Sequence, residues 1–560
     1  MTKQRLSGRA AFLKLLQEEG VTHVFGNPGT TELALMEAMP EATELKYVLG
    51  LQESVVLSMA DGFARATGRL TAVNLHCTPG LGHAMGALYN AKFSGSPMIV
   101  TAGQYELGYG LLEPMLYEPL VPIAEPLVKW AYELQRVEDL PRVVRRAAKI
   151  ALTPPCGPVF LSLPGSILDD VAELDLGFST RVEALGGPSK RTQGALVDAI
   201  LSSKAPIIIA GRELAEQDAF AEAQAFAELI GAPVYHEPIP YNARYPSTHA
   251  AFMGDLSRNQ AKVRELLGKH DLLIVLGGDL LRMSAFSQTD PMPNDLKVIH
   301  ISEREWELGK NYSTHLAVRS GAKETLAELL PQIASAQSPD DKEQAGARLG
   351  KLRDANWTVR REELRAQAST AQTATPIDPR VLAMTIADAV PSNAIVIEEA
   401  PTTAPLLANF LKVTQPRDFF GLASGGLGFA MGGAVGAALG RRDTPVVALV
   451  GDGSAMYAIQ ALWTAAHEQL PITYVIVNNK SYRIIKERLV AMRNCDDFLG
   501  MDLVNPALDF VEMARGMGVT ADRVADPSQL ASALRAAIES RQPQLLEVIV
   551  DAGTQAVGQG

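Results

Sequence analysis

Residues 446–454, with the sequence VVALVGDGS, decide the fold of this chain. The first five residues are apolar and predict a buried strand, and the Gly-Asp-Gly sequence after them predicts a tight turn. A helical pattern follows at 457–469, and a second apolar run at 472–477 predicts another strand, which ends at Asn478 and Asn479. A strand, a helix and a second strand in this order are typical of a parallel sheet whose faces are covered by helices.

The two predicted strands end in side chains that suit a metal ion and a diphosphate. Asp452 and Asn479 offer carboxylate and amide oxygens, which are ligands for Mg²⁺ or Ca²⁺. The glycines of the turn let backbone N–H groups approach phosphate oxygens, and the N-terminus of the following helix attracts negative charge. A Gly-Asp-Gly turn alone is more often only a tight connection between a strand and a helix. The Asn-Asn pair, with 24 residues between Gly453 and Asn478, favours the metal-bridged diphosphate instead.

The rest of the chain repeats this alternation of apolar runs and helical patterns. Short, fully apolar runs predict strands that helices bury on both faces. The expected strands are 21–25, 47–51, 70–75, 97–102 and 159–163 in a first block, 206–210, 271–276 and 296–301 in a second, and 394–397, 445–450 and 472–477 in a third. The sequence therefore predicts an α/β protein with three doubly wound parallel-sheet domains.

Changes in composition mark the borders between these blocks. Residues 180–194 contain a Gly-Gly-Pro-Ser sequence and are expected to form a linker. The polar segment 335–378 is expected to be linker-like except for a helix around 357–366. The predicted domains are residues 1–180, 190–335 and 375–555.

Composition narrows the possible functions of the chain. It has 560 residues, 47% of them hydrophobic, and a net charge of −12, which argues against a nucleic-acid surface. We find no signal peptide and no apolar run long enough to cross a membrane, so no membrane partner is expected. The three cysteines, Cys77, Cys156 and Cys495, are far apart, which is typical of a reduced, cytoplasmic protein.

Two polar residues of the first block also follow predicted strands, at the edge of a parallel sheet where ligands usually bind. Glu53 follows the short strand at 47–51 and opens a helix, where an acid favours the helix dipole even without a further function. His76 follows another predicted strand. Residues 62–76 echo residues 436–451, since both run from a helix of small residues through Gly-Arg into a strand. The echo suggests that the first and third blocks are related domains, each with chemistry at a strand end.

The GDG turn followed, one strand-helix-strand unit later, by the NN pair resembles the signature of the thiamine diphosphate (ThDP)-dependent enzymes. Within this family the chain most resembles the benzoylformate decarboxylases, over nearly its whole length. The stretches that carry the resemblance are 24–30 (VFGNPGT) with Glu32 and Leu33, 51–53 (LQE), 74–76 (NLH), Gly82, 84–88 (AMGAL), 99–104 (IVTAGQ), 425–430 (GGLGFA), 451–454 (GDGS) and 461–466 (ALWTAA). The resemblance implies a pyrimidine-binding, a middle Rossmann-like and a diphosphate-binding domain, in that order.

The resemblance also implies roles for individual residues. Glu53 would hydrogen-bond the aminopyrimidine ring of the cofactor and so activate it, which requires a carboxyl group within reach of the ring. Leu427 would hold the two cofactor rings in a bent form, and His76 would act as an acid or base near the reacting carbon. The implied metal ligands are Asp452, Asn479 and Ser481, the last through its backbone carbonyl. The other implied cofactor contacts are Thr402, Thr403, Gly425, Gly451, Gly453, Ser454 and Tyr482.

The chain departs from the benzoylformate decarboxylases at several expected substrate positions. Thr30 replaces a serine that holds the substrate carboxylate, and His83 replaces an asparagine. Ser284 falls where the family has a second histidine. Arg483, Lys486 and Arg488 replace an apolar wall and favour a more anionic substrate, unless they only form a solvated helix face. The residues that could line an apolar pocket or pack in the core are Leu111, Leu112, Met115 and Leu116.

The resemblance implies a Mg²⁺-dependent, non-oxidative decarboxylation of a 2-oxo acid in which His76, His83 and Thr30 would assist Glu53. An alternative is a ThDP-dependent carboligase or lyase, similar to acetolactate synthase, benzaldehyde lyase or 2-hydroxyacyl-CoA lyase. A non-catalytic protein that binds ThDP or another nucleotide is less favoured, because Glu53, His76, Asp452 and Asn479 are all present.

Two further expectations concern cofactors and assembly. The second block has no Gly-x-Gly-x-x-Gly sequence, so FAD is not expected there. Glu53 and the diphosphate motif lie in different domains, and in this family such sites are completed by a second subunit. The resemblance therefore implies a homo-oligomer, a dimer or a tetramer, with the active site at a subunit interface.

Overall fold

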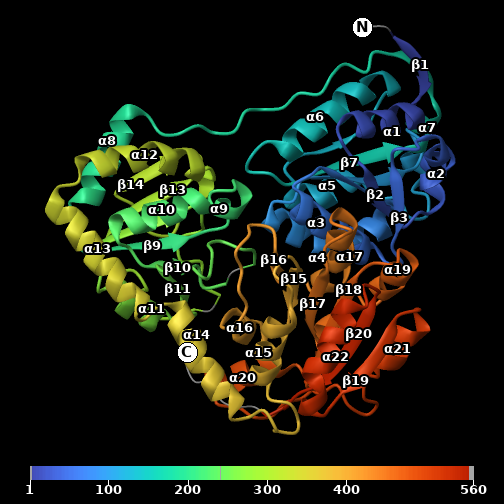
Figure 1. The fold of residues 1–560 in the computed structure, drawn as a ribbon. Helices are drawn as coiled ribbons and strands as arrows, with labels where there is room; N and C mark the ends of the chain where they lie inside the picture. The colour runs from blue at the N-terminus through green and yellow to red at the C-terminus, as the bar shows by residue number, and fades with distance from the viewer. Residues whose placement is uncertain (1–2, 240, 285, 554–560) are drawn as a thin grey trace.

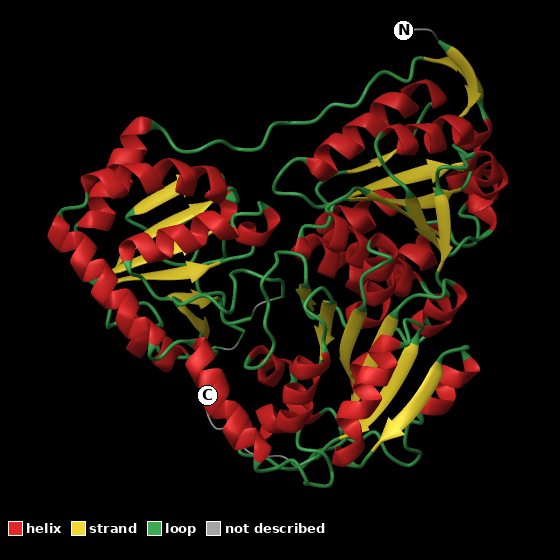
Figure 2. Ribbon diagram, viewed as in Figure 1, coloured by secondary structure: helices red, strands yellow, loops and turns green. Residues whose placement is uncertain are grey.

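The computed structural model describes residues 3–239, 241–284 and 286–553. The described residues form three six-stranded sheets, in which every pair of neighbouring strands is parallel, and one small two-stranded sheet made of β1 (Gln4–Ser7) and β8 (Val171–Leu174). Figure 2 shows helices on both sides of the large sheets. The predicted fold class, α/β with three doubly wound parallel sheets, is confirmed.

The first large sheet has the strand order β3-β2-β4-β5-β7-β6. Its strands are β2 (His23–Gly26), β3 (Lys46–Leu49), β4 (Thr71–Leu75), β5 (Met98–Gln104), β6 (Ala131–Glu133) and β7 (Pro158–Pro164). The helices of this part are α1 (Gly8–Glu18), α2 (Leu33–Ala38), α3 (Glu53–Thr67), α4 (Cys77–Ser94), α5 (Leu120–Ala124), α6 (Leu140–Leu152) and α7 (Gly165–Asp169).

The middle sheet has the order β11-β10-β9-β12-β13-β14. Its strands are β9 (Pro206–Ala210), β10 (Val234–His236), β11 (Phe252–Asp255), β12 (Leu272–Leu276), β13 (Lys297–Ser302) and β14 (Leu316–Arg319). Its helices are α8 (Lys190–Leu201), α9 (Glu213–Glu216), α10 (Phe220–Ile230), α11 (Gln260–Leu267) and α12 (Ala322–Ala336). An extended segment without helix or strand, residues 175–189, leads into it from the first part (Figure 1).

The third sheet has the order β16-β15-β17-β18-β20-β19. Its strands are β15 (Ile395–Glu399), β16 (Phe419–Gly421), β17 (Val446–Gly451), β18 (Ile472–Asn478), β19 (Thr520–Val524) and β20 (Gln544–Ile549). Its helices are α15 (Pro379–Ala389), α16 (Ala404–Ala408), α17 (Phe429–Gly440), α18 (Asp452–Ala455), α19 (Ala461–His467), α20 (Arg483–Arg493), α21 (Phe510–Gly516) and α22 (Pro527–Glu539).

All predicted strands are present, each within two residues of its expected limits. Fully apolar runs predicted them well, because strands covered on both faces need no polar side. The strands that were not predicted (β1, β6, β8, β10, β11, β14, β16, β19 and β20) are shorter or carry polar residues. The domain limits stay a prediction, and residues 1, 2, 240, 285, 554 and 555 of the predicted domains lie outside the described residues.

Predictions for three connecting segments need correction. The linker expected at 180–194 ends earlier, because α8 begins at Lys190 with the Ser189 side chain as its N-cap. The linker-like chain expected before residue 357 is wrong, since α13 (Pro339–Arg353) precedes α14 (Trp357–Ser369). Ser338 and Asp341 form a capping box at its start, and only Ala345 of this helix is buried, so no apolar stripe marked it in the sequence.

The single helix expected at 457–469 is divided. α18 starts earlier, at Asp452, and is one turn long, while α19 begins at Ala461. Between them the chain makes successive turns, in which the N–H groups of Tyr457 and Ala458 donate to carbonyl oxygens three residues back. No helix of the described residues combines the length and the apolar character needed to span a membrane.

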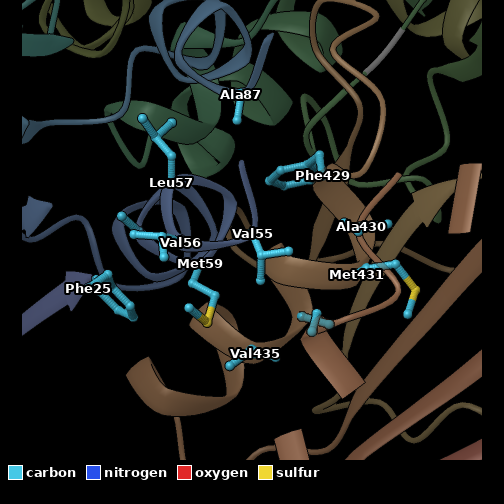
Figure 3. Close-up of a cluster of buried hydrophobic side chains, with 14 of the residues drawn as sticks. Phe25, Val55, Val56, Leu57, Met59, Ala87, Phe429, Ala430, Met431 and Val435 are labelled. Atoms are coloured by element: carbon cyan, nitrogen blue, oxygen red, sulfur yellow. The ribbon is translucent and has the colours of Figure 1, made fainter. Parts of the chain in front are cut away.

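The largest apolar core joins the first and third sheets through α3 and α17. Figure 3 shows Val55 and Met59 of α3 packed beside Met431 and Val435 of α17. The helices approach closely because a Cβ on Gly436 would lie only 1.8 Å from the carbonyl oxygen of Met59. Glu53 begins one of these helices and Leu427 immediately precedes the start of the other, so this packing sets the relative position of two predicted cofactor contacts.

Candidate cofactor and active site

The predicted metal and diphosphate residues come together at the carboxyl edge of the third sheet. β17 and β18 are neighbours, with Gly451 beside Val477. The Asp452 carboxylate accepts hydrogen bonds from the N–H of Gly453, at 2.7 Å, and of Asn479, at 3.0 Å. The parallel pairing therefore places the Gly-Asp-Gly turn against the Asn-Asn pair, as the sequence predicted.

The surroundings of Asp452 fit a cation. Its side chain is buried, and burial raises its pKa to about 6 because the charged form is removed from water. Among the described residues no Lys, Arg or His forms an ion pair with it. The side-chain oxygen of Asn479 accepts from both the N–H and the hydroxyl of Ser481, at 3.0 Å each, which holds these residues together.

The donor chemistry is that of a hard divalent cation. A carboxylate, an amide oxygen and a backbone carbonyl are the oxygen ligands that Mg²⁺ and Ca²⁺ prefer. No group of three or more His, Cys, Asp or Glu side chains suited to a metal occurs in the part of the chain that the structure describes. Residues Asp452, Asn479 and Ser481 would therefore hold Mg²⁺ without help from sulfur or imidazole ligands.

The turn itself fits a diphosphate. A Cβ on Gly453 would lie 2.5 Å from the ring of Tyr482, so only glycine lets this ring cover the turn. A Cβ on Gly451 would meet nothing closer than 3.7 Å, which is ordinary van der Waals contact. Ser454 is buried in the short helix α18. A backbone turn with exposed N–H groups and little side-chain bulk can approach phosphate oxygens closely.

The other predicted cofactor contacts lie at or beside the same edge of the sheet. β15 is the neighbour of β17, with Glu399 beside Val450, and the buried Thr403 and half-buried Thr402 follow β15. Leu427 is half-buried in the loop before α17. Gly425 in this loop has a φ of +87° and no atom within 4 Å of its Cβ position, a conformation that favours glycine.

One residue of this edge was missed by the sequence analysis. Glu399, the last residue of β15, is only 1% exposed. Its two carboxylate oxygens accept hydrogen bonds from the N–H of Gly428, at 2.6 Å, and of Ala430, at 2.7 Å. Burial raises its pKa to about 8, against the lowering effect of these hydrogen bonds. The only sequence signal was an acidic residue at the end of an apolar run.

Glu53 lies at the start of α3, as predicted, and Gln52 caps the helix. The side chain of Glu53 is only 12% exposed. Its carboxylate accepts from the side-chain amide of Asn27, at 3.4 Å, and lies 3.1 Å from Nδ1 of His83. Among the described residues, these hydrogen bonds join Glu53 only to the first sheet and its helices, and none reaches Asp452 or Asn479.

His76 is held by a buried acid that the sequence did not single out. Its Nδ1 lies 2.8 Å from the carboxylate of Glu32, whose side chain is fully buried. Glu32 also accepts from the backbone N–H groups of Gly29 and Gly103, at 2.9 Å each, and from the hydroxyl of Thr31, at 2.7 Å. These three donors fix the carboxylate, and the carboxylate in turn fixes the imidazole ring.

The neighbouring threonines differ in position. The hydroxyl of Thr31 lies 3.2 Å from Nδ1 of His76, whereas Thr30, the residue predicted to hold a substrate, is exposed and contacts neither Glu32 nor His76 through a hydrogen bond. Thr30 is therefore free to meet a ligand, and Thr31 belongs to the support of His76.

Glu53, His76 and His83 gather around the first turns of α4. His76 precedes this helix, and a Cβ on Gly80 would lie 3.5 Å from both the Glu53 carboxylate and the Cβ of His76. The side chain of His83 is 63% exposed, so its ring borders Glu53 from the solvent side. The first sheet thus brings together three of the four predicted catalytic residues within one small region.

The three basic residues that replace the apolar wall of the benzoylformate decarboxylases differ in their surroundings. Arg483 pairs with Glu487 and donates to the carbonyl of Asp551, and Lys486 pairs with Asp502. Their charges are already compensated, so of the three basic residues only the exposed Arg488 remains a candidate for an anionic substrate.

The predicted apolar residues are mostly on the surface. Leu111, Leu112 and Met115 have exposed fractions of 89%, 70% and 81%, so core packing is wrong for these residues. Ser284 is also exposed, in the loop after β12. Exposed apolar groups close together in sequence indicate a surface that a ligand or another chain covers.

Comparisons with known proteins agree with this geometry. Three family models match the chain: the N-terminal thiamine pyrophosphate-binding domain at residues 6–114, the central domain at 194–329 and the C-terminal thiamine pyrophosphate-binding domain at 402–548. A benzoylformate decarboxylase from Pseudomonas aeruginosa is 32% identical, over 96% of this chain and 98% of that protein. A putative acetolactate synthase large subunit from Mycobacterium tuberculosis is 29% identical, over 97% and 99%.

Solved structures give the same result. The ThDP-dependent 4-hydroxybenzoylformate decarboxylase of Rhodococcus jostii has a TM-score of 0.87 and 30% identity, over 98% of this chain and all of that chain. The chain therefore belongs to the thiamine diphosphate-dependent enzyme family. Within that family it is similar to the benzoylformate decarboxylases over almost its full length.

Proposed function

We propose that the protein catalyses the Mg²⁺- and ThDP-dependent, non-oxidative decarboxylation of a 2-oxo acid. The observation that carries this proposal is the grouping of Glu53, His76 and His83 around the first turns of α4, in a chain similar to benzoylformate decarboxylases along its length. A ThDP-dependent decarboxylase needs one acid to activate its cofactor and a second group to move a proton at the substrate.

The residues of the third sheet would hold the cofactor. Asp452, Asn479 and the carbonyl of Ser481 would bind Mg²⁺, and the turn from Gly451 to Ser454, with Thr402 or Thr403, would bind the diphosphate. When bound, ThDP supplies a thiazolium carbon that adds to the ketone and accepts the electrons released as CO₂ leaves. Tyr482, Gly425 and Leu427 would surround the rings.

The residues of the first sheet would handle protons. Glu53 is largely shielded from water and would hold a proton at the aminopyrimidine ring. Nδ1 of His76 faces Glu32, so an Nδ1–H donates to this carboxylate and Nε2 is left to exchange a proton with the substrate. Thr30 would bind the substrate carboxylate, and His83 would assist Glu53.

A homo-oligomer follows from this division of roles. The hydrogen bonds of Glu53 lie within the region of the first sheet. Those of Asp452 and Asn479, which we call the diphosphate clamp together with the turn from Gly451 to Ser454, lie within the region of the third sheet. A second subunit, in a dimer or a tetramer, would complete each site by bringing one Glu53 to the other chain's clamp. The exposed Leu111, Leu112 and Met115 support a surface of this kind.

The middle sheet argues against a nucleotide cofactor such as FAD. Nucleotides bind at the carboxyl ends of parallel strands, but here buried carboxylates fill these ends. The Glu213 side chain accepts from the hydroxyl of Ser302, at 2.6 Å, and from the N–H of Glu303, at 3.0 Å. A Cβ on Gly278 would lie 2.2 Å from the carboxylate of Glu237.

The test is a substrate screen with the protein loaded with ThDP and Mg²⁺. Aromatic, aliphatic and acidic 2-oxo acids are offered one at a time, and CO₂ release and the aldehyde product are measured. At least one class should release CO₂ and give the corresponding aldehyde. Failure of every class to release CO₂ would remove the decarboxylase proposal.

Carboligation or lyase activity is the second candidate. It is favoured by Ser284, which stands where the benzoylformate decarboxylases have a histidine and cannot act as a base, and by the similarity to acetolactate synthases. In the same screen an acceptor aldehyde is added. A 2-hydroxy ketone as the main product would support this second candidate over simple decarboxylation.

A further inference from the structure

The buried carboxylate of Glu399 spans the junction between the loop of Leu427 and helix α17. One oxygen accepts from the N–H of Gly428 and the other from the N–H of Ala430, which are the residues before and after Phe429, the first residue of the helix. Gly428 has a φ of +101°, a left-handed conformation that favours glycine, at the point where Glu399 holds the chain. The carboxylate therefore fixes where the loop ends and the helix begins.

On its N-terminal side the loop packs against α4, since a Cβ on Gly426 would lie 2.2 Å from the carbonyl oxygen of Gly86, but few hydrogen bonds hold Leu427 itself. It directly precedes Gly428, and the nearest backbone N–H group on its other side, that of Gly426, donates only a long hydrogen bond of 3.4 Å to the hydroxyl of Ser424. Gly425 has open space around its Cβ position and a positive φ. The strongest polar contacts of this loop are thus the two that Glu399 makes at its end.

Glu399 also lies beside the diphosphate turn. It pairs with Val450 of β17, one residue before Gly451. A Cβ on Gly451 would lie 3.7 Å from the carbonyl oxygen of Glu399. A single strand end therefore contacts the turn through its backbone and through a hydrogen bond between the side chains of Glu399 and Ser454, and the same carboxylate contacts the Leu427 loop.

We propose that Glu399 is a positioning residue for the cofactor: it sets Leu427 against the two rings, at a fixed place relative to the diphosphate turn. The inference rests on the proposed role of Leu427. Glu399 acts through the loop and does not touch the cofactor. A carboxylate suits this task because it offers an acceptor to each of two N–H groups. A glutamine offers one oxygen and turns an N–H₂ group towards the second donor.

The neighbouring Glu398 provides a matched control. It precedes Glu399 on β15 and points to the opposite face of the strand. A Cβ on Gly421 would lie 2.3 Å from its carboxylate, so Glu398 faces β16 and not the Leu427 loop. Burial raises the pKa of Glu398 to about 7, so the two acids experience similar desolvation. Glu398→Gln therefore makes the same chemical change in the same strand.

The experiment measures binding and not turnover. Full-length wild type, Glu399→Gln, Glu398→Gln and Leu427→Ala, all freed of cofactor, are titrated by calorimetry with ThDP and, separately, with inorganic pyrophosphate, each with Mg²⁺ present. Pyrophosphate reports on the diphosphate clamp alone, whereas ThDP also requires its rings to be supported. Because no substrate is involved, a wrong assignment of the reaction does not affect the result.

We expect Glu399→Gln to weaken ThDP binding by about tenfold, the change that corresponds to one lost hydrogen bond. Pyrophosphate binding should stay within about twofold of wild type, and Glu398→Gln should change neither ligand. Leu427→Ala should reproduce the selective loss while leaving Glu399 intact, which keeps the test decisive if Glu399→Gln does not fold. Wild-type ThDP affinity in Glu399→Gln or Leu427→Ala, or an equal loss of both ligands, would overturn the inference.

Discussion

Gly62 of α3 and Gly433 of α17 let two helices from different sheets touch backbone to backbone. A Cβ on Gly62 would lie 2.1 Å from the carbonyl oxygen of Gly433, far inside van der Waals contact. This contact lies in the apolar core that joins the first and third sheets. Because Glu53 starts α3 and Leu427 precedes α17, the same contact determines how the two candidate halves of the site are placed within one chain.

Replacing this glycine should therefore destabilise the protein. Gly62→Ala must force the helices apart or distort them, at a cost of about 1–3 kcal/mol. Thermal unfolding followed by circular dichroism should show a lower Tm. The control is Gly194→Ala in α8, where no atom lies within 4 Å of the Cβ position and helix propensity favours alanine by up to about 1 kcal/mol. An unchanged Tm in Gly62→Ala would show that the packing relaxes without strain.

Glu53→Gln should lower turnover by a factor of about 100 or more while the fold is kept, since a glutamine cannot hold and return a proton. Exchange of the thiazolium C2 proton of bound ThDP for deuterium, followed by NMR, should slow to a similar extent. Near-normal exchange in the variant would exclude Glu53 from cofactor activation. If wild type itself showed no exchange, the non-catalytic alternative would gain support.

Removal of the metal should release the cofactor. Asp452 is a buried carboxylate whose hydrogen bonds come from backbone N–H groups, so a cation is the natural compensation for its charge. Chelation by EDTA should abolish ThDP binding, and added Mg²⁺ should restore it. Asp452→Asn should weaken Mg²⁺-dependent ThDP binding by at least about tenfold, measured by calorimetry, because one charged ligand is lost. Metal-independent ThDP binding would contradict the assignment.

Glu32 should support His76 without contacting substrate. In Glu32→Gln, two of the four donors around the carboxylate meet an N–H₂ group, because each oxygen of Glu32 faces two donors, so the imidazole loses its fixed orientation. We expect kcat to fall by about 10- to 100-fold, within the range of general acid–base effects, with KM nearly unchanged. The control is Glu37→Gln, since the Glu37 side chain is 70% exposed and pairs only with Arg9. A change in KM alone would indicate that Glu32 affects substrate binding and not proton transfer.

His23 should make the fold sensitive to mild acid. Burial, with added repulsion from Lys46 and Arg442, lowers the pKa of His23 from 6.5 to about 4. Between these values the unfolded chain binds a proton that the folded protein does not, so stability should fall as pH drops from about 6.5 to about 4. His23→Phe, which keeps the ring beside Phe63, should flatten this part of the curve of Tm against pH. An equally steep curve in the variant would assign the acid sensitivity to other groups.

Much of the fold could be predicted because the sequence patterns of its strands and turns lie within short segments of the chain. The runs at 206–210 and 472–477 become β9 and β18 because short segments made mostly of apolar residues are typical of strands buried between helices. The Gly-Asp-Gly turn and the Asn-Asn pair meet because parallel strands end at one edge of a sheet. α13 escaped prediction because a helix that buries one residue has no apolar stripe to reveal it.

The sequence by itself determined the class of fold, the strand ends and the residues that resemble a cofactor site. Only the tertiary structure decided which acids support that site. Glu32 and Glu399 are two of 63 acidic residues; Glu32 stands in a stretch that carries the family resemblance, but no local pattern showed that either acid supports a site residue. Their partners lie 44 and 29 residues away in the chain, at His76 and Gly428. A carboxylate is positioned by the N–H groups that surround it after folding, and these are brought together by long-range strand pairing and helix packing.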